Sequence, residues 1–146
     1  MDAIESIVSD FELLGDWDQR YQYLVELGEG LPEMPAALHS EENRVKACMS
    51  RVWVYAREDM AEPGKIRFGG DCDTGIIKGV LALLIQLADG KTVAEIDAID
   101  MDEFFEQLQL GEHLSPNRHV GVYAIVDLMK QQAAAVGVHL NHAVSA

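Results

Sequence analysis

Residues 51–56 are Arg51-Val52-Trp53-Val54-Tyr55-Ala56, and residues 65–68 are Lys65-Ile66-Arg67-Phe68. Both runs are rich in β-branched and aromatic residues, and the second alternates charged with apolar side chains, as a half-buried strand does. Between them, Pro63-Gly64 is a strong turn signal. These features predict a β-hairpin. We expect residues 44–47 to add a third short strand, with Cys48 at the bend before the hairpin.

The segments on either side of the hairpin have the apolar spacing of helices. Residues 2–14 and 17–27 form two such segments, and Asp16 is a suitable N-cap for the second. Residues 73–88 are apolar on nearly all sides, which is typical of a buried helix. The segment 29–43 contains two prolines and is expected to be irregular, with one short helix near residues 36–38.

The chain beyond residue 90 carries three helix start signals. Capping-box patterns begin at Thr92 and Asp100, and Ser115-Pro116 places a cap and a first-turn proline ahead of a long final helix. Gly137 is a suitable end for that helix. We therefore expect one α+β domain over residues 1–137, with helices packed on a small three-stranded antiparallel sheet, and a frayed tail over residues 138–146.

Composition narrows the class of protein. With 49 % hydrophobic and 25 % charged residues, the chain has the balance of a folded globular protein. A net charge of −14 repels phosphate backbones, so we expect no nucleic acid partner. No apolar run approaches the roughly 20 residues of a membrane helix, and the N-terminus lacks the pattern of a signal peptide. We expect no membrane partner and a cytoplasmic location.

The two cysteines, Cys48 and Cys72, are too few for a disulfide scaffold. No cysteine and histidine pair has the spacing of a structural zinc site, so we expect no bound metal. Six of the eleven Lys and Arg residues fall between positions 44 and 67, and cations near Cys48 favour its thiolate. A reactive thiol and an inert buried thiol both fit. A catalytic Cys–His pair has weak support, because both candidate histidines, His39 and His119, are distant in sequence.

Four blocks of sequence carry a further signal. They are Leu31-Pro32-Glu33-Met34-Pro35, the run from Glu41 to Trp53 around Cys48, Gly70-Asp71-Cys72-Asp73 leading into Ile76-Ile77-Lys78-Gly79, and Leu114-Ser115-Pro116-Asn117-Arg118 before Gly121. In their order and spacing, these blocks resemble the SufE family, which includes its paralogue CsdE, across nearly the whole chain.

The resemblance implies a fold like that of the IscU scaffold proteins and a role as a sulfur acceptor. Cys48 matches the family cysteine that takes persulfide sulfur from a pyridoxal-phosphate cysteine desulfurase of the SufS or CsdA type and stimulates it. The sulfur then passes to an iron–sulfur scaffold or another acceptor. No turnover is expected without the desulfurase, and no cofactor is expected in this chain, because the pyridoxal phosphate belongs to the partner.

Three further residues are candidates for the site. Cys72 stands where the family more often has serine, so it is either a second thiol or a small residue of no consequence. A hairpin turn centred near residue 61 would place residue 50 opposite Cys72, and so bring Cys72 near Cys48. Asp73 can cap the following helix or lie against the Cys48 segment. Arg118 begins the final helix, where a cation opposes the helix dipole, which indicates another role such as holding the cysteine segment.

Several alternatives stay open at this point. A CsdE-like paralogue would serve a different desulfurase and another sulfur-transfer pathway. A thiol peroxidase or hydrolase would need a resolving thiol or a base near Cys48, and for the first only Cys72 offers itself. An iron–sulfur or zinc scaffold would need more metal-ligating cysteines than this chain has.

Overall fold

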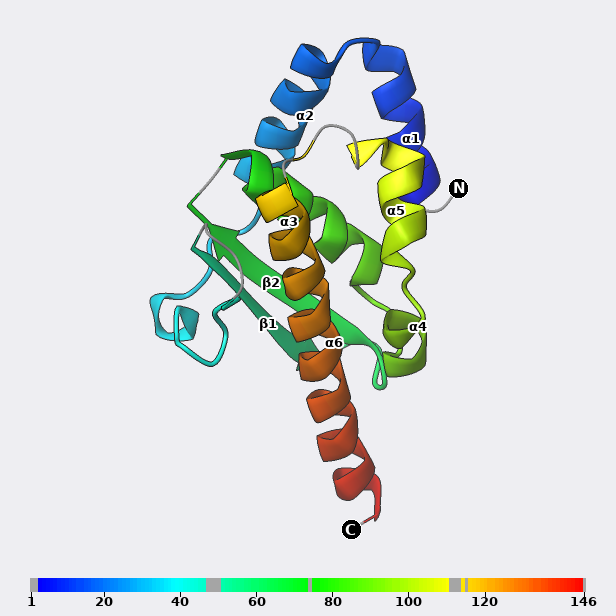
Figure 1. The fold of residues 1–146 in the computed structure, drawn as a ribbon. Helices are drawn as coiled ribbons and strands as arrows, with labels where there is room; N and C mark the ends of the chain where they lie inside the picture. The colour runs from blue at the N-terminus through cyan, green and yellow to red at the C-terminus, as the bar shows by residue number, and fades with distance from the viewer. Residues whose placement is uncertain (1–2, 47–50, 74, 111–113, 115, 146) are drawn as a thin grey trace.

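The computed structural model describes residues 3–46, 51–73, 75–110, 114 and 116–145, and it is a mixed fold of helices and one antiparallel sheet (Figure 1). Its elements, in chain order, are α1 (Ala3–Leu14), α2 (Trp17–Glu29), the 3-10 helix η1 (Ala36–Leu38), β1 (Val52–Glu58), β2 (Ile66–Cys72), α3 (Gly75–Ala88), α4 (Val93–Asp97), α5 (Met101–Leu108) and α6 (Pro116–Ser145). In this part of the chain, no helix is both long and apolar enough to cross a membrane.

The predicted hairpin is confirmed, with a different register. Strands β1 and β2 pair from Val52 with Cys72 to Glu58 with Ile66. We expected residue 50 to lie opposite Cys72, so the turn is centred one residue later in the chain than predicted. The Asp59 side chain explains the shift, because its carboxylate accepts the Ala61 N–H at 2.9 Å and orders the loop beyond Glu58.

The expected third strand over residues 44–47 is wrong for the residues that the structure describes, which form a two-stranded sheet. Arg44 makes a single antiparallel bridge to Trp53. Val45 follows with a hydrogen bond to Val52, the first residue of β1, and Lys46 already belongs to a turn, so the pairing ends there. Residue 47, where the expected strand ends, lies outside the described residues.

Helix α3 lies at the centre of the molecule, as its all-round apolar sequence predicted, and contacts α2, β2 and α6. Its side chains at Ile77, Leu81 and Leu84 are at most 2 % exposed. Helices α2 and α3 cross with their backbones in contact at Gly79. A Cβ there would lie 2.0 Å from the Leu24 carbonyl oxygen, so only glycine fits.

The two short helices begin where the sequence predicted. At α4, Thr92 and Glu95 form a complete capping box. At α5, the Asp100 carboxylate accepts the N–H groups of Asp102 and Glu103. The caps thus define the starts of the two helices that connect α3 to α6.

The final helix is longer than expected. Gly137 does not end α6, which continues to Ser145, and Figure 1 shows its last turns projecting beyond the other elements. A Cβ at Gly137 would lie 2.9 Å from Val93 Cγ2, so this glycine permits close packing of α6 on α4 rather than a helix end. The helix therefore includes residues 138–145, which we expected to be frayed, while the domain limit at residue 137 stays a prediction.

Candidate functional site

Cys48 itself lies outside the described residues, but the chain on both sides of it is placed. The Val45 N–H donates to the Val52 carbonyl at 2.8 Å, so the segment leaves and rejoins the sheet at one point. Arg51 is held from the other side, because its N–H donates to Asp73 Oδ1 at 3.0 Å and its carbonyl accepts the Asp73 N–H at 3.1 Å. Both ends of the Cys48 segment are therefore fixed at the start of β1.

Asn43 anchors the approach to this segment through both its backbone and its side chain. Its carbonyl accepts the Val54 N–H at 2.9 Å, and its amide nitrogen donates to the Leu38 carbonyl at 3.0 Å. From α6, Gln132 Nε2 donates to the Val54 carbonyl at 2.8 Å and lies 3.4 Å from Asn43 Oδ1. A residue 89 positions away thus holds the chain that leads to Cys48.

The predicted residues Cys72 and Asp73 lie at the end of β2, beside the anchors just described. Cys72 is 6 % exposed and belongs to the core cluster, where it pairs with Val52. Asp73 is exposed and binds the Arg51 backbone. The structure therefore brings both residues to the strand end from which the Cys48 segment departs, and the roles predicted for their side chains stay predictions.

Arg118 lies in the first turn of α6 and is half-buried. Helix α6 as a whole packs on β1, β2 and α3. The role that we predicted for Arg118, holding the cysteine segment, involves residues outside the described part and stays a prediction.

Sequence reasoning missed a polar cluster on the outer face of this strand end. The Asp71 carboxylate lies 2.9 Å from His39 Nε2 and 3.4 Å from Lys78 Nζ. It also accepts a hydrogen bond from the Cys72 N–H at 2.9 Å. The His39 ring also meets Trp53 edge-on at 4.9 Å. Asp71 stood out in sequence beside Cys72, but its partners lie 7 and 32 positions away, and no local pattern indicates such contacts.

The cluster shifts the pKa values of both its titratable members. The hydrogen bond to Asp71 raises the pKa of His39 above its ordinary value, despite partial burial. Burial alone raises the pKa of Asp71, but the hydrogen bonds from His39 and Cys72 and the charge of Lys78 outweigh it and lower that pKa. The pair therefore favours a charged Asp71 and a protonated His39.

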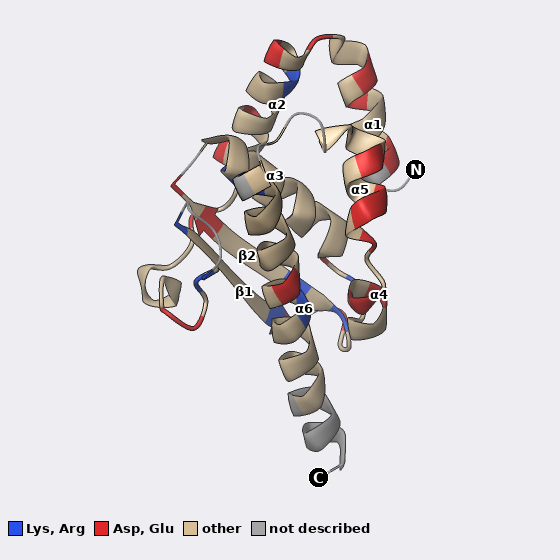
Figure 2. Ribbon diagram, viewed as in Figure 1, with Lys and Arg blue, Asp and Glu red and all other residues tan. Residues whose placement is uncertain are grey.

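The cations that cluster in sequence are separated in space. Arg44 and Lys46 pair with Glu41 ahead of the Cys48 segment. Arg57, Lys65 and Arg67 lie at the other end of the hairpin, where Figure 2 shows Lys and Arg gathered on the sheet. Arg57 is five strand residues beyond Val52, about 16 Å away at 3.3 Å per residue. Arg57, Lys65 and Arg67 are therefore remote from the start of β1, where the Cys48 segment joins the sheet.

Among the described residues, no group of three or more His, Cys, Asp or Glu side chains is arranged to hold a metal ion. The polar groups at the strand end instead bind one another and the backbone on either side of Cys48. Fold and site together define a small α+β protein whose candidate reactive cysteine follows an anchored turn and precedes a hairpin.

Comparison of the sequence with known proteins assigns the chain to a family. The SufE family, described as an Fe-S metabolism associated domain, matches residues 5–133, and the chain belongs to this family. SufE-like proteins from Rhizobium meliloti and Rhizobium etli are 36 % identical over 135 residues and 35 % identical over 134 residues, respectively. Each alignment covers 91 % of this chain, with 96 % of the first protein and 90 % of the second.

A solved structure supports the fold. The solution structure of a hypothetical protein from Thermus thermophilus superimposes with a TM-score of 0.75, covering 94 % of this chain and 99 % of the other, at 21 % identity. The resemblance inferred from four short blocks is thus confirmed at the level of the family and of the mixed fold.

Proposed function

We propose that this chain accepts sulfur on Cys48 from the persulfide of a pyridoxal-phosphate cysteine desulfurase and delivers it toward iron–sulfur cluster assembly. The observation that carries the proposal is the match of residues 5–133 to a family associated with Fe-S metabolism. The anchored chain on both sides of Cys48 is the geometric support, since a transferring thiol must be presented reproducibly to its partner.

The proposed transfer is a thiol–disulfide type of exchange. The Cys48 thiolate attacks the terminal sulfur of the desulfurase persulfide, a new sulfur–sulfur bond forms, and the bond to the desulfurase cysteine breaks. The electron pair of that bond leaves with the desulfurase thiolate, so the exchange needs no external oxidant or reductant. Arg44 and Lys46 precede Cys48 but are paired with Glu41, so the proposal assigns them no charge effect on the thiolate.

The proposed function assigns roles to the surrounding residues. Asp73 fixes the backbone where the segment rejoins β1, because it binds the Arg51 N–H and carbonyl. Cys72 is a packing residue in this proposal, because its 6 % exposure restricts access by a second thiol or by an oxidant. That burial favours sulfur transfer over a peroxidase that would use Cys72 to resolve Cys48.

The test is the sulfide release of a SufS- or CsdA-type desulfurase with L-cysteine and reductant. We expect wild-type chain and Cys72→Ser to accelerate release to the same extent, and Cys48→Ser to give no acceleration. Loss of acceleration in Cys72→Ser alone, with that variant still folded, would contradict the assignment to Cys48.

A further inference from the structure

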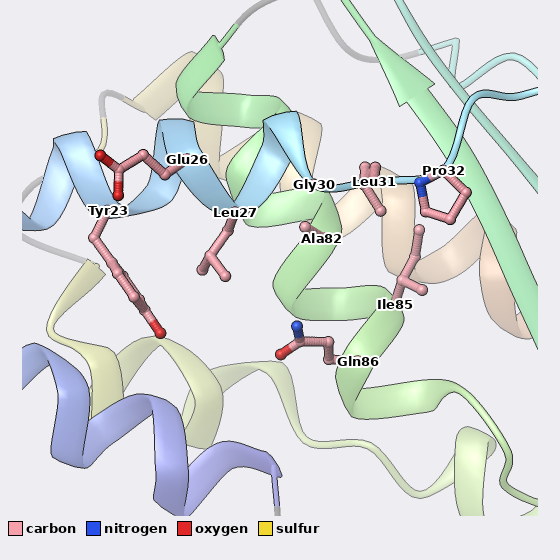
Figure 3. A pocket seen from close by; sticks show the side chains of 9 residues that line it. All are labelled: Tyr23, Glu26, Leu27, Gly30, Leu31, Pro32, Ala82, Ile85 and Gln86. Carbon is pink, nitrogen blue, oxygen red and sulfur yellow. The ribbon is translucent and has the colours of Figure 1, made fainter.

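A groove on the α2 side of the molecule is not used by the proposed sulfur transfer. One hollow of about 440 Å³ lies between α2 and α3, with Tyr23 and Gln86 at one end (Figure 3). A second hollow, of about 240 Å³, follows the edge of β2. Because both are lined by Leu31, Pro32 and Ile85, the two hollows are adjacent, and we call them together the α2–β2 groove.

The groove ends on an unpaired strand edge. Val54 is bonded on its outer side to Asn43 and Gln132, so its cross-strand neighbour Gly70 points its N–H and carbonyl away from β1. In the described part of the chain, Asp89 accepts the Phe68 N–H, but the outward groups of Gly70 have no partner. Gly70 is buried and lines the groove, and buried backbone groups are rarely left unpaired.

The same end of the groove carries an unneutralised cation. Arg57 is exposed and makes no ion pair within 4.0 Å among the described residues. Asp59 interacts with it only through longer-range electrostatic attraction. Its cross-strand partner is Arg67, a like charge that is neutralised by Asp89 at 3.1 Å. Because Arg67 is already paired, Arg57 is the member of this pair that is an electrostatic match for a carboxylate.

We propose that the α2–β2 groove binds an extended segment of a protein partner, which adds to the β2 edge at Gly70 and places an acidic side chain against Arg57. The segment's backbone satisfies the Gly70 N–H and carbonyl, as in strand addition. Leu27, Leu31 and Ile85 give its alternate side chains an apolar floor. This docking goes beyond sulfur acceptance and does not depend on the chemistry of Cys48.

The test is a titration of ¹⁵N-labelled chain with a short capped peptide of alternating valine and threonine that carries one aspartate near one end. We expect the Gly70 amide signal to shift at peptide concentrations up to about 1 mM, the range of a weak single-segment contact. Arg57→Glu is expected to weaken binding roughly tenfold, as loss of one charge-assisted contact does. A peptide with lysine in place of aspartate is expected to bind Arg57→Glu better than wild type.

Lys65→Glu is the matched control, because it makes the same charge change on the same hairpin outside the groove. It is expected to retain binding, and retained signal dispersion establishes that both variants fold. No Gly70 shift up to that concentration, or equal weakening by both variants, would overturn the proposal. Shifts confined to residues flanking Cys48 would also overturn it, because the peptide would then bind at the other site.

Discussion

At the scale of single residues, the strand end beside Cys48 depends on side chains that bind backbone atoms. Asp73 holds Arg51, Asn43 holds Val54, and Gln132 reaches across from α6 to the same strand. None of these contacts is local in sequence. The sequence therefore identified Asp73 as a candidate but supplied no reason to select Gln132.

Gln132 is expected to contribute measurably to stability. Gln132→Leu removes the donor to the Val54 carbonyl and is expected to lower the free energy of unfolding by about 1–2 kcal/mol. Urea denaturation measures this change. Gln131→Leu, an exposed neighbour on the same helix, is the control and should change stability by less than about 0.5 kcal/mol. Equal effects of the two variants would rule out a specific role for the Gln132 hydrogen bond.

The pair of His39 and Asp71 predicts a pH dependence. Because the pKa of His39 is raised in the folded state, its stabilising contribution is complete below its unfolded value near 6.5 and is lost as pH rises through the folded value. Asp71 has a lowered pKa, so its own contribution is lost at the acidic extreme. Wild type should therefore exceed His39→Asn in unfolding free energy by more at about pH 5.5 than at about pH 8.5.

Chemical denaturation of both proteins across this range measures the difference. Asp71→Asn should abolish the same pH-dependent part, and the double variant should lose no more of it than either single variant. A difference between wild type and His39→Asn that grows with rising pH would show that the sign of the His39 shift is wrong.

At the scale of elements, helix–helix contacts depend on glycines as much as on apolar stripes. The stripes predicted the existence and order of the helices, and capping residues predicted where α4 and α5 begin. One such glycine misled the prediction of a helix end. Gly137 was expected to end the final helix, yet it lies inside α6, at a close contact with α4.

The crossing of α2 and α3 gives a sharp test of this view. Gly79→Ala would place a Cβ at 2.0 Å from the Leu24 carbonyl oxygen, so we expect a loss of about 1–3 kcal/mol in unfolding free energy, or more if the helices cannot separate. Gly75→Ala is the control, because its Cβ would meet Val25 at an ordinary 3.5 Å. A fully stable Gly79→Ala protein would refute the close crossing.

The hairpin shows which structural features local sequence patterns predict and which they do not. Alternation and the Pro63-Gly64 turn predicted two antiparallel strands, but the register depended on Asp59. The third strand failed because β1 begins at Val52 and the chain turns at Lys46. The position of Cys48 relative to Cys72 could not be derived from pairing alone, since a shift in register moves every cross-strand neighbour.

At the scale of the whole molecule, charge is distributed unevenly. The chain carries a net charge of −14, and Figure 2 shows acidic residues along α1 and α5, while Lys and Arg gather on the sheet. The ion pairs among described residues all keep solvent contact, with side chains 18–79 % exposed, so each contributes little. Self-repulsion of the acidic surface therefore dominates the electrostatic contribution to stability.

This balance predicts that added salt stabilises the chain. Raising sodium chloride from about 0.02 M to about 0.5 M shortens the screening length from roughly 20 Å to roughly 4 Å, which weakens long-range repulsion. The thermal midpoint is expected to rise by a few degrees, which corresponds to about 1 kcal/mol for a protein of this size. A midpoint that falls with salt would mean that the ion pairs outweigh the repulsion.

The central claim is that Cys48 is the sulfur acceptor, and peptide mass mapping tests it most directly. The chain would be incubated with a cysteine desulfurase and L-cysteine, trapped with an alkylating reagent and digested. We predict one added sulfur on the peptide that contains Cys48, none on the peptide that contains Cys72, and no added sulfur in Cys48→Ser. Sulfur on Cys72 in the wild type, or loading that persists in Cys48→Ser, would contradict the account.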